Sequence, residues 1–323
     1  MHASGKRVLV AGAAGFLGSH LCDRLVADGY FLIALDNLSS GNWSNIDQLR
    51  GTRQIEFREH DIRDRLNIVD IGADIETVVN FACPASPVDY MADPIGTTRT
   101  AVLGTLNMLE FSRALGARMV QASTSEVYGD PLHHPQREGD WGNVNPVGAR
   151  ACYAEGKRCA ESLAADFIRQ DADVRILRIF NAYGPRMRPD DGRVISTFLR
   201  QALAGDPITI HGDGTQTRSL CYVDDLVEAV VRTIEGPGRL PGPMNVGSPH
   251  EVTISEIAAT ILRITGSPSR VVETSARPDD PRRRRPDISL ARAYLDWEPM
   301  VGLEEGLRRT LAQLDDQRVE RGA

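Results

Sequence analysis

Short apolar runs alternate with longer amphipathic stretches from Arg7 to Phe180. Apolar runs rich in β-branched residues are typical of buried strands, whereas apolar residues at helical spacing indicate helices. We therefore predict strands over Arg7–Ala11, Tyr30–Leu35, Ile55–Arg58, Thr77–Ala82, Arg118–Ser123 and Val174–Phe180, and helices over Ser19–Asp28, Thr98–Leu115 and Tyr153–Gln170. Strands that alternate with helices predict an α/β fold with a doubly wound parallel sheet, which binds its ligand at the carboxyl ends of the strands.

The alternation becomes less regular after Phe180. The chain has 323 residues, which is enough for a large α/β domain and a smaller lobe. We predict a first domain over residues 1–180, with residues 219–247 packed back on it through a helix over Tyr222–Glu235. Residues 181–218 and 248–323 are expected to form the smaller lobe, which binds the substrate.

A glycine-rich segment, Gly12-Ala-Ala-Gly15-Phe-Leu-Gly18, joins the first predicted strand to the first predicted helix. Glycines at this place let the backbone approach a pyrophosphate, whose charge is favoured by the helix N-terminus. Asp36 follows Gly18 by 18 residues, at the end of the second strand, where an acid receives the adenosine ribose. A carboxylate there repels a 2′-phosphate. We therefore predict a Rossmann-like domain that binds NAD rather than NADP; the alternative is a solvated aspartate in a turn.

A second group of polar residues follows the fifth strand. Thr124, Ser125 and Glu126 end that strand, and Tyr153 and Lys157 lie four residues apart on one face of the next helix. An ammonium beside a phenol favours the phenolate, so we expect Lys157 to lower the pKa of Tyr153 and make it a proton-transfer group. Thr124 can share the substrate hydroxyl with Tyr153, so the three residues suit oxidation of a secondary alcohol. By itself a Tyr-x-x-x-Lys pair also fits a solvated helix, so its weight depends on the dinucleotide motif.

Composition limits the function classes. The net charge is −7, from 37 basic and 44 acidic residues, which argues against a nucleic-acid-binding protein and requires a local basic pocket for any anionic ligand. No apolar run is long enough to span a bilayer, and the N-terminus has no apolar signal region. The cysteines show no framework spacing, so we expect reduced thiols in a cytoplasmic protein; they are Cys22, Cys83, Cys152, Cys159 and Cys221.

A pair of histidines and a run of four arginines each allow more than one interpretation. His133 and His134 are adjacent in a proline-rich loop and share no face, so we expect no metal site there. Four arginines, Arg282 to Arg285, stand between two prolines. They fit a solvated patch, a nuclear targeting signal or a guanidinium for an anionic ligand, and charge alone favours the solvated patch.

The glycine motif, Asp36, Thr124, Tyr153 and Lys157 together resemble the extended short-chain dehydrogenase/reductase superfamily. More specifically, six segments resemble UDP-glucuronate decarboxylases, also called UDP-xylose synthases: STSEVYGDP, HPQ-x-E, WG-x-VNP-x-G-x-RACY-x-EGKR, RIFN-x-YGPRM, DGRV and DDP-x-x-R-x-PDI. The resemblance extends from about Arg7 to Leu311. The RACY-x-EGKR block and the C-terminal arginine block are its most specific parts.

The resemblance implies an enzyme that decarboxylates UDP-glucuronate to UDP-xylose through a 4-keto sugar, with NAD regenerated. It implies a homodimer formed by a helical bundle, to which Thr98–Leu115 and Tyr153–Gln170 would contribute. The implied catalytic residues are Thr124, Glu126, Tyr153, Lys157 and Arg284. The implied cofactor contacts are Gly12, Gly15, Phe16, Leu17, Gly18, Asp36, Asn37, Ser39, Ser40, Gly41, Asp61, Ile62, Phe81, Ala82, Cys83, Thr100, Ala122, Tyr153, Lys157 and Arg193. The implied substrate contacts are Ala85, Tyr90, Thr124, Ser125, Arg150, Asn181, Thr209, Arg218 and Arg284.

Two departures and three rival functions follow from the resemblance. Ala101 stands where the superfamily often has Asn, and Cys83 where the family often has Ser, so cofactor contacts are expected to loosen. A nucleotide-sugar 4,6-dehydratase is the nearest rival, but the thymidine-nucleotide branch carries an aspartate at the position of Ser125. A 4-epimerase leaves Glu126 without a task. A non-catalytic NAD-binding regulator leaves the Thr/Tyr/Lys set without one.

Overall fold

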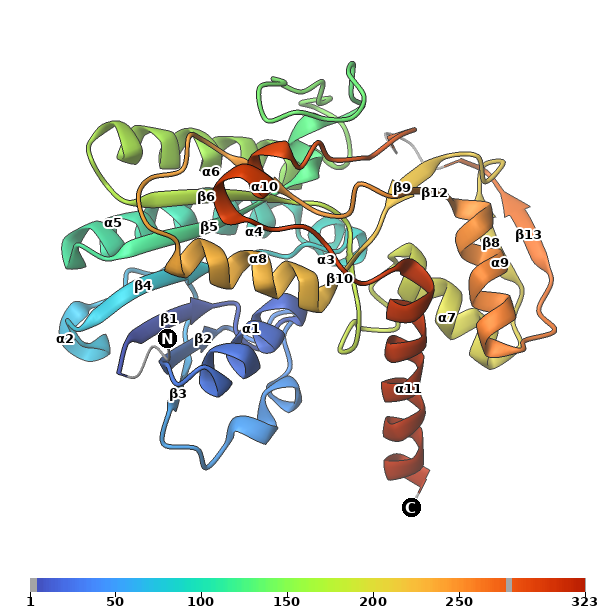
Figure 1. Ribbon diagram of the computed structural model, residues 1–323, viewed down its shortest axis with the longest axis horizontal. Helices are drawn as coiled ribbons and strands as arrows, with labels where there is room; N and C mark the ends of the chain where they lie inside the picture. The colour runs from blue at the N-terminus through green and yellow to red at the C-terminus, as the bar shows by residue number, and fades with distance from the viewer. Residues whose placement is uncertain (1–4, 277–280, 323) are drawn as a thin grey trace.

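A seven-stranded parallel sheet forms the centre of the computed structural model, which describes residues 5–276 and 281–322 (Figure 1). Its strand order is β3-β2-β1-β4-β5-β6-β11. Neighbours are in parallel register, for example Val10 with Ala34 and with Val79. The strands are β1 (Arg7–Ala11), β2 (Phe31–Asp36), β3 (Ile55–Glu59), β4 (Ile75–Asn80), β5 (Arg118–Thr124), β6 (Val174–Ile179) and β11 (Met244–Val246). This confirms the predicted α/β, Rossmann-like class, and adds β11 as a strand that the hydrophobic pattern did not reveal.

Helices cover both faces of this sheet because successive strand residues point to opposite sides. Val8 and Val10 belong to one buried core, which includes α1 (Phe16–Ala27) and α8 (Val223–Glu235). Leu9 and Ala11 belong to the other, which includes α5 (Thr105–Leu115) and α6 (Ala151–Arg169). The uninterrupted apolar strands of the sequence follow from this double cover.

The predicted single helix over Thr98–Leu115 is divided in the structure. It begins earlier, as α4 (Pro94–Arg99), continues through a π-helical segment over Thr100–Gly104 and then becomes α5. Such π-turns often occur at functional sites. Ala101 lies in this segment and packs against α6, where a Cβ added to Gly156 would stand 2.9 Å from the Ala101 Cβ.

The smaller lobe lies at one end of the sheet, to the right in Figure 1. It contains α7 (Val194–Ala204), β8 (Ile208–His211), α9 (Ile254–Thr265) and β13 (Val271–Thr274), with β8 and β13 paired in parallel. The other elements are β7 (Ala182–Tyr183), β9 (Thr217–Ser219), β10 (Cys221–Tyr222), β12 (Glu251–Thr253), α2 (Ile68–Ile71), α3 (Pro87–Ala92), α10 (Ser289–Leu295), α11 (Leu303–Gly322) and the short 3-10 helices η1 (Trp43–Asn45), η2 (Asp47–Leu49) and η4 (Ser125–Tyr128).

The chain returns to the first domain after β13, at α10 and the segment that follows it. The Trp297 indole donates to the Asp225 carbonyl at 2.8 Å, and the Asp225 carboxylate accepts from the Val301 amide at 2.9 Å. Trp297 and Leu295 of α10 share the core with α8 and β11. This differs from the predicted assignment of residues 248–323 to the lobe alone, because the pattern of a short helix does not reveal which core it joins. The division into two domains otherwise stays a prediction.

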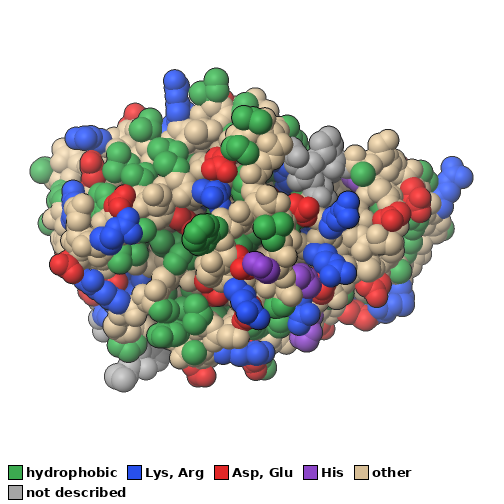
Figure 2. Space-filling view, turned by 90° about the horizontal axis from the view of Figure 1, so that it is seen from above, with side chains coloured by type: hydrophobic (Ala, Val, Ile, Leu, Met, Phe, Trp, Pro, Cys, Tyr) green, Lys and Arg blue, Asp and Glu red, His purple; other side chains and the backbone are tan. Residues whose placement is uncertain are grey.

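The surface shown in Figure 2 mixes basic, acidic and hydrophobic side chains, so the excess negative charge is not gathered in one area of that face. Within residues 5–276 and 281–322, no helix combines the length and the apolar character that crossing a membrane requires.

Candidate active site

A cavity of about 380 Å³ opens at the carboxyl ends of the parallel strands and extends to the smaller lobe. It brings together residues far apart in the sequence, from Gly12 to Arg284. Every site residue named from the sequence lines it except Gly41 and Asp61. Gly41 lies against the Asp36 carboxylate, and Asp61 accepts from the Asn37 amide at 2.8 Å. The assignments of individual residues to cofactor and substrate, these two included, stay predictions.

The glycine motif forms a narrow cradle at the start of α1. Gly12 has a φ of 80°, and a Cβ there would stand 2.9 Å from the backbone of Ala82. A Cβ on Gly18 would stand 2.0 Å from the Gly12 carbonyl oxygen, so only glycine lets the helix approach the strand this closely. Helix α1 has no acidic residue in its first turn and no side-chain cap on its amides. These features fit the pyrophosphate of a dinucleotide.

Asp36 ends β2 inside the same cavity. Its carboxylate accepts from the amides of Ala14 at 2.9 Å and Leu38 at 2.8 Å, which fixes its orientation. Burial raises the pKa of this carboxyl, and the two backbone hydrogen bonds oppose that rise. The carboxylate is thus held beside the glycine cradle, where a ribose would lie in a dinucleotide complex.

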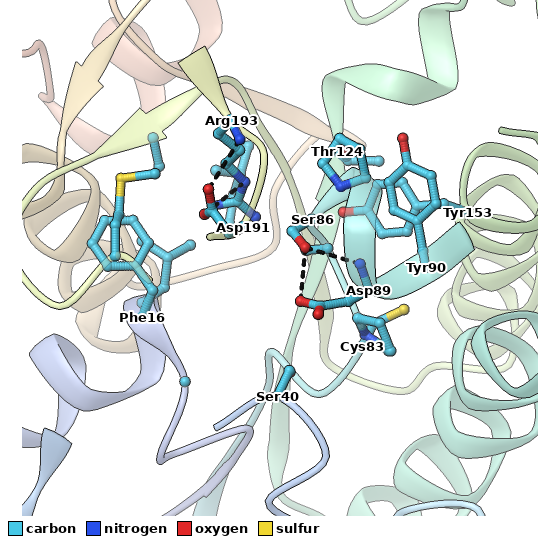
Figure 3. Close-up of a pocket in the computed structure, with 18 of the residues that line it drawn as sticks. Phe16, Ser40, Cys83, Ser86, Asp89, Tyr90, Thr124, Tyr153, Asp191 and Arg193 are labelled. Atoms are coloured by element: carbon cyan, nitrogen blue, oxygen red, sulfur yellow. Dashed lines mark hydrogen bonds and ion pairs between the residues drawn. The ribbon is translucent and has the colours of Figure 1, made fainter. Parts of the chain in front are cut away.

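The Tyr/Lys pair lies on the buried face of α6. Tyr153 and Lys157 are 7% and 4% exposed, which removes the solvated-helix interpretation. The Lys157 ammonium donates to the Ala122 carbonyl of β5 at 2.9 Å. The Tyr153 ring stacks on the ring of Tyr90, with a centroid distance of 5.2 Å and an interplanar angle of 3°. Figure 3 shows Tyr90 and Tyr153 beside Thr124 on one side of the cavity.

The expected lowering of the Tyr153 pKa is wrong for the protein as described. Burial raises the pKa of Tyr153, and the neighbouring Cys83 adds to the rise. A hydrogen bond with Thr124 and the charge of Arg193 oppose it only in part. The charge of Lys157 favours a lower pKa, but desolvation of a phenol buried on α6 and stacked on Tyr90 outweighs it.

Glu126 lies between two arginines. Thr124 caps η4 by accepting from the Glu126 amide at 3.2 Å, which turns the chain directly after β5. Both Arg150 and Arg284 then donate to Oε1 of Glu126, each at 2.9 Å. Arg284 also donates to Oδ1 of Asn181 at 3.2 Å. Glu126 and Arg284, two of the catalytic residues that the resemblance implies, are therefore in direct contact.

The arginine run contains residues in different environments. Arg282 and Arg283 are exposed and Arg285 is partly buried, whereas Arg284 is 6% exposed and lines the cavity. The solvated-patch interpretation is thus wrong for Arg284 and right for the first two arginines. Asp279 and Asp280, the first two residues of the DDP-x-x-R-x-PDI segment, lie outside the described residues.

The cavity is basic within an acidic chain, as an anionic ligand requires. Seven basic and four acidic side chains line it among the described residues. Two of the basic residues, Arg186 and Arg188, were not among the predicted site residues; they follow β7 and pair with Asp23 at 2.6 Å and Asp89 at 2.8 Å. Their signal was the basic YGPRMRP segment directly after a strand end. Asp191 was not predicted either; it accepts from the Arg193 amide at 3.0 Å across the cavity from Thr124 (Figure 3).

The adjacent histidines each bond a different carboxylate. His133 Nδ1 lies 3.0 Å from Asp140, and His134 Nε2 lies 3.0 Å from Glu251. No cluster of three potential metal-ligating side chains was found among the described residues. All five cysteines are free thiols, and burial raises the pKa of Cys22, Cys83 and Cys221.

Comparison with known proteins decides the family. Residues 8–247 match the NAD dependent epimerase/dehydratase family. UDP-glucuronic acid decarboxylase 6 of Arabidopsis thaliana is 48% identical over 306 residues, which cover 94% of this chain and 87% of that protein. UDP-glucuronic acid decarboxylase 1 of Xenopus tropicalis is 45% identical, with coverage of 95% and 71%. The chain belongs to the UDP-glucuronic acid decarboxylases of the NAD dependent epimerase/dehydratase family. The resemblance stated from the motifs and the predicted cofactor class are thereby confirmed.

Solved structures of this family share the fold across different activities. UDP-glucose 4-epimerase of Thermotoga maritima, solved with UDP-glucose, has a TM-score of 0.88 and 31% identity, covering 97% of this chain and 99% of that one. UDP-glucuronic acid 4-epimerase of Bacillus cereus, solved with UDP-glucuronic acid and NAD, has a TM-score of 0.86 and 27% identity, with coverage of 96% and 99%. The fold alone therefore does not separate decarboxylation from epimerisation, and the separation depends on the site.

Proposed function

We propose that this protein converts UDP-glucuronate to UDP-xylose and carbon dioxide, with NAD as a cofactor that is regenerated in each cycle. The observation that carries the proposal is the contact of Glu126 with Arg284 beside Thr124 and Tyr153 in one basic cavity. An epimerase needs the Thr/Tyr/Lys set but has no clear use for this ion pair. The decarboxylase relatives, at 45–48% identity over most of the chain, support the same conclusion.

The residues that would hold NAD are the glycine cradle, Asp36 and the ends of β4 and β5. Bound there, NAD would supply a hydride acceptor for the sugar C4 and a hydride donor after the loss of carbon dioxide. Lys157, fixed to the Ala122 carbonyl, places an ammonium on the same helix face as Tyr153. The raised pKa of Tyr153 favours the protonated phenol, so nearby positive charge is needed before Tyr153 can act as a base.

Each group then has a task in the chemistry. Tyr153 removes the proton of the C4 hydroxyl, with Thr124 hydrogen-bonded to the same oxygen. The C4 ketone makes the sugar a β-keto acid, so loss of carbon dioxide leaves an enolate whose charge Tyr153 and Thr124 stabilise as donors. Arg284, held by Glu126 and Asn181, would orient the sugar so that the breaking bond stands perpendicular to the ketone plane. The enolate is then protonated at C5.

Turnover of sugar nucleotides tests this proposal. Purified protein should release carbon dioxide and UDP-xylose from UDP-glucuronate, and should form no 6-deoxy-4-keto sugar from UDP-glucose. Ser125 motivates the second expectation, because a hydroxyl at this buried position is a poor acid near neutral pH. A main product of 6-deoxy-4-keto sugar would favour a dehydratase, and UDP-galacturonate from UDP-glucuronate would favour an epimerase.

We also propose a cytoplasmic homodimer. Free thiols at all five cysteines support a reducing compartment. Exposed apolar side chains on α4 and the π-helical segment, namely Ile95 at 67% and Leu103 at 48%, support an interface beside α6. Light scattering of the purified protein measures the oligomeric state, and a monomer of 35.4 kDa at micromolar concentration would contradict the dimer.

A further inference from the structure

The Glu126–Arg284 ion pair joins residues 158 positions apart in the chain. Glu126 lies on η4, but the chain from Pro281 to Asp287 has neither helix nor strand apart from a single bridge at Pro286. A buried ion pair is favourable only if its geometry is held, because desolvation of both charges must be offset. Backbone without regular structure does not hold a side chain by itself. The placement of Arg284 therefore depends on residues that fix this segment.

Gln136 holds the segment on both sides of Pro286. Its side-chain Oε1 accepts from the Arg285 backbone amide at 2.7 Å. Its backbone amide donates to the Arg285 carbonyl at 2.9 Å. Its carbonyl accepts from the Asp287 amide at 2.8 Å. Gln136 is 1% exposed, so water does not compete for these bonds. The residue directly after Arg284 is thus fixed at both its donor and its acceptor.

Asn245 of β11 joins this clamp to the central sheet. Its Nδ2 donates to the carbonyls of Gln136 and Asp287, each at 3.1 Å. Its Oδ1 accepts from the Tyr128 hydroxyl at 2.6 Å. Asn245 is fully buried, so every hydrogen bond of this amide is made within the protein.

Tyr128 brings the same network to the other half of the ion pair. It ends η4, two residues after Glu126, and is fully buried. Its hydroxyl also accepts from Arg178 Nη1 at 2.9 Å. Arg178 is in turn paired with Glu161 of α6 at 2.7 Å. One line of hydrogen bonds, from η4 through Asn245 to Gln136, therefore fixes both the carboxylate side and the guanidinium side.

We propose that Asn245 and Gln136 are positioning residues that hold the Arg284 guanidinium within hydrogen-bond distance of the Glu126 carboxylate. The inference rests on the proposed function, because it assigns Asn245 and Gln136 to the decarboxylating half of the site. Neither residue lines the cavity, so both act through Arg284. Displacement of a positioned group by about 1 Å can cost on the order of 10²-fold in rate.

Two variants test the proposal by different chemistry. Asn245→Asp keeps the oxygen that accepts from Tyr128 but replaces the donor with an oxygen that faces two carbonyls. Gln136→Met keeps the length of the side chain but removes the acceptor of the Arg285 amide. Each variant should lower kcat on UDP-glucuronate by about 10- to 100-fold, with KM changed only a few-fold and the content of bound NAD unchanged.

Combination with Arg284→Lys separates positioning from a general structural effect. If Asn245 acts through Arg284, Asn245→Asp should cost only about twofold more in the Arg284→Lys background, because coupled residues are not additive. Thr233→Val is the matched control, since Thr233 is fully buried on α8 and its hydroxyl donates only to the Ala229 carbonyl at 2.7 Å among the contacts described. This variant should leave kcat unchanged in both backgrounds.

Three results would overturn the inference. They are losses that multiply in the double variant, wild-type kcat in both single variants, and loss of folding in both single variants as measured by thermal unfolding. The last result would make the two residues structural. Wild-type protein that does not turn over UDP-glucuronate would instead overturn the proposed function, so the two failures are distinguishable.

Discussion

Replacement of Arg284 by lysine tests the centre of the proposed site. Lysine keeps the positive charge but loses the planar fork that donates to Glu126 at 2.9 Å and Asn181 at 3.2 Å. Glu126 would retain the hydrogen bond from Arg150, also at 2.9 Å, so the carboxylate is not left without a cation. The change therefore removes orientation more than charge.

The size of the effect follows from these contacts. A hydrogen bond to a charged group contributes about 1.5–3 kcal/mol. At about 1.36 kcal/mol for each tenfold change in rate, its loss in the transition state corresponds to a decrease of roughly 10- to 100-fold in kcat. The glycine cradle and Asp36 belong to other elements, so NAD should stay bound in the variant.

The assay is steady-state release of carbon dioxide from UDP-glucuronate, with bound NAD measured by mass spectrometry after denaturation. Arg282→Lys is the matched control, because Arg282 belongs to the same run and is exposed. It should stay within about twofold of wild type, as is usual for surface substitutions. Equal, mild losses in both variants would refute the reasoning and remove Arg284 from the site.

Three further predictions concern the cofactor half and the proton-transfer group. Tyr153→Phe should lower turnover by roughly 10²–10⁴-fold with NAD still bound. Because burial raises the pKa of Tyr153, the wild-type rate should increase with pH across the neutral range. A flat pH profile would contradict the role of Tyr153 as a base. Gly18→Ala places a Cβ 2.0 Å from the Gly12 carbonyl and should lower the unfolding free energy by about 1–3 kcal/mol and deplete bound NAD, whereas Gly139→Ala, with open space around its Cβ, should change neither. Purified protein should carry NAD(H), and Asp36→Asn should retain less NAD and accept NADP; NADP in the wild-type protein would show that the interpretation of Asp36 is wrong.

Much of the sheet could be predicted from the sequence because most of its six longest strands are rich in apolar residues and alternate with helical segments, although β3 carries three charged residues. The seventh, Met244–Val246, has only three residues, too few for a periodic signal. The division of the Thr98–Leu115 helix was also not predictable. The π-helical segment is only five residues long, too short to change the helical spacing of apolar residues along the sequence. Helix starts shifted by up to a turn, as for α1, which begins at Phe16 directly after the glycine cradle.

The site divides in a similar way. Residues within one motif, such as Tyr153 and Lys157, could be placed together by helical spacing. The contact of Glu126 with Arg284 could be proposed only through resemblance, because no local pattern brings these distant segments together. The pKa of Tyr153 was predicted in the wrong direction because desolvation depends on packing with Tyr90, which the sequence does not show.

The separation of Glu126 and Arg284 along the chain has a consequence for the order in which the parts of the site form during folding. Asp36 and the glycine cradle meet across only 22 positions, as in the Ala14–Asp36 hydrogen bond, whereas the ion pair needs 158. Contacts of high sequence separation pay their loop-closure entropy before they gain any energy, so they form late in folding. A chain emerging from the ribosome can thus complete its nucleotide cradle long before Arg284 has been synthesised. The part of the site that contains the glycine cradle and the part that contains the Glu126–Arg284 ion pair therefore come together only after residue 284 has been synthesised.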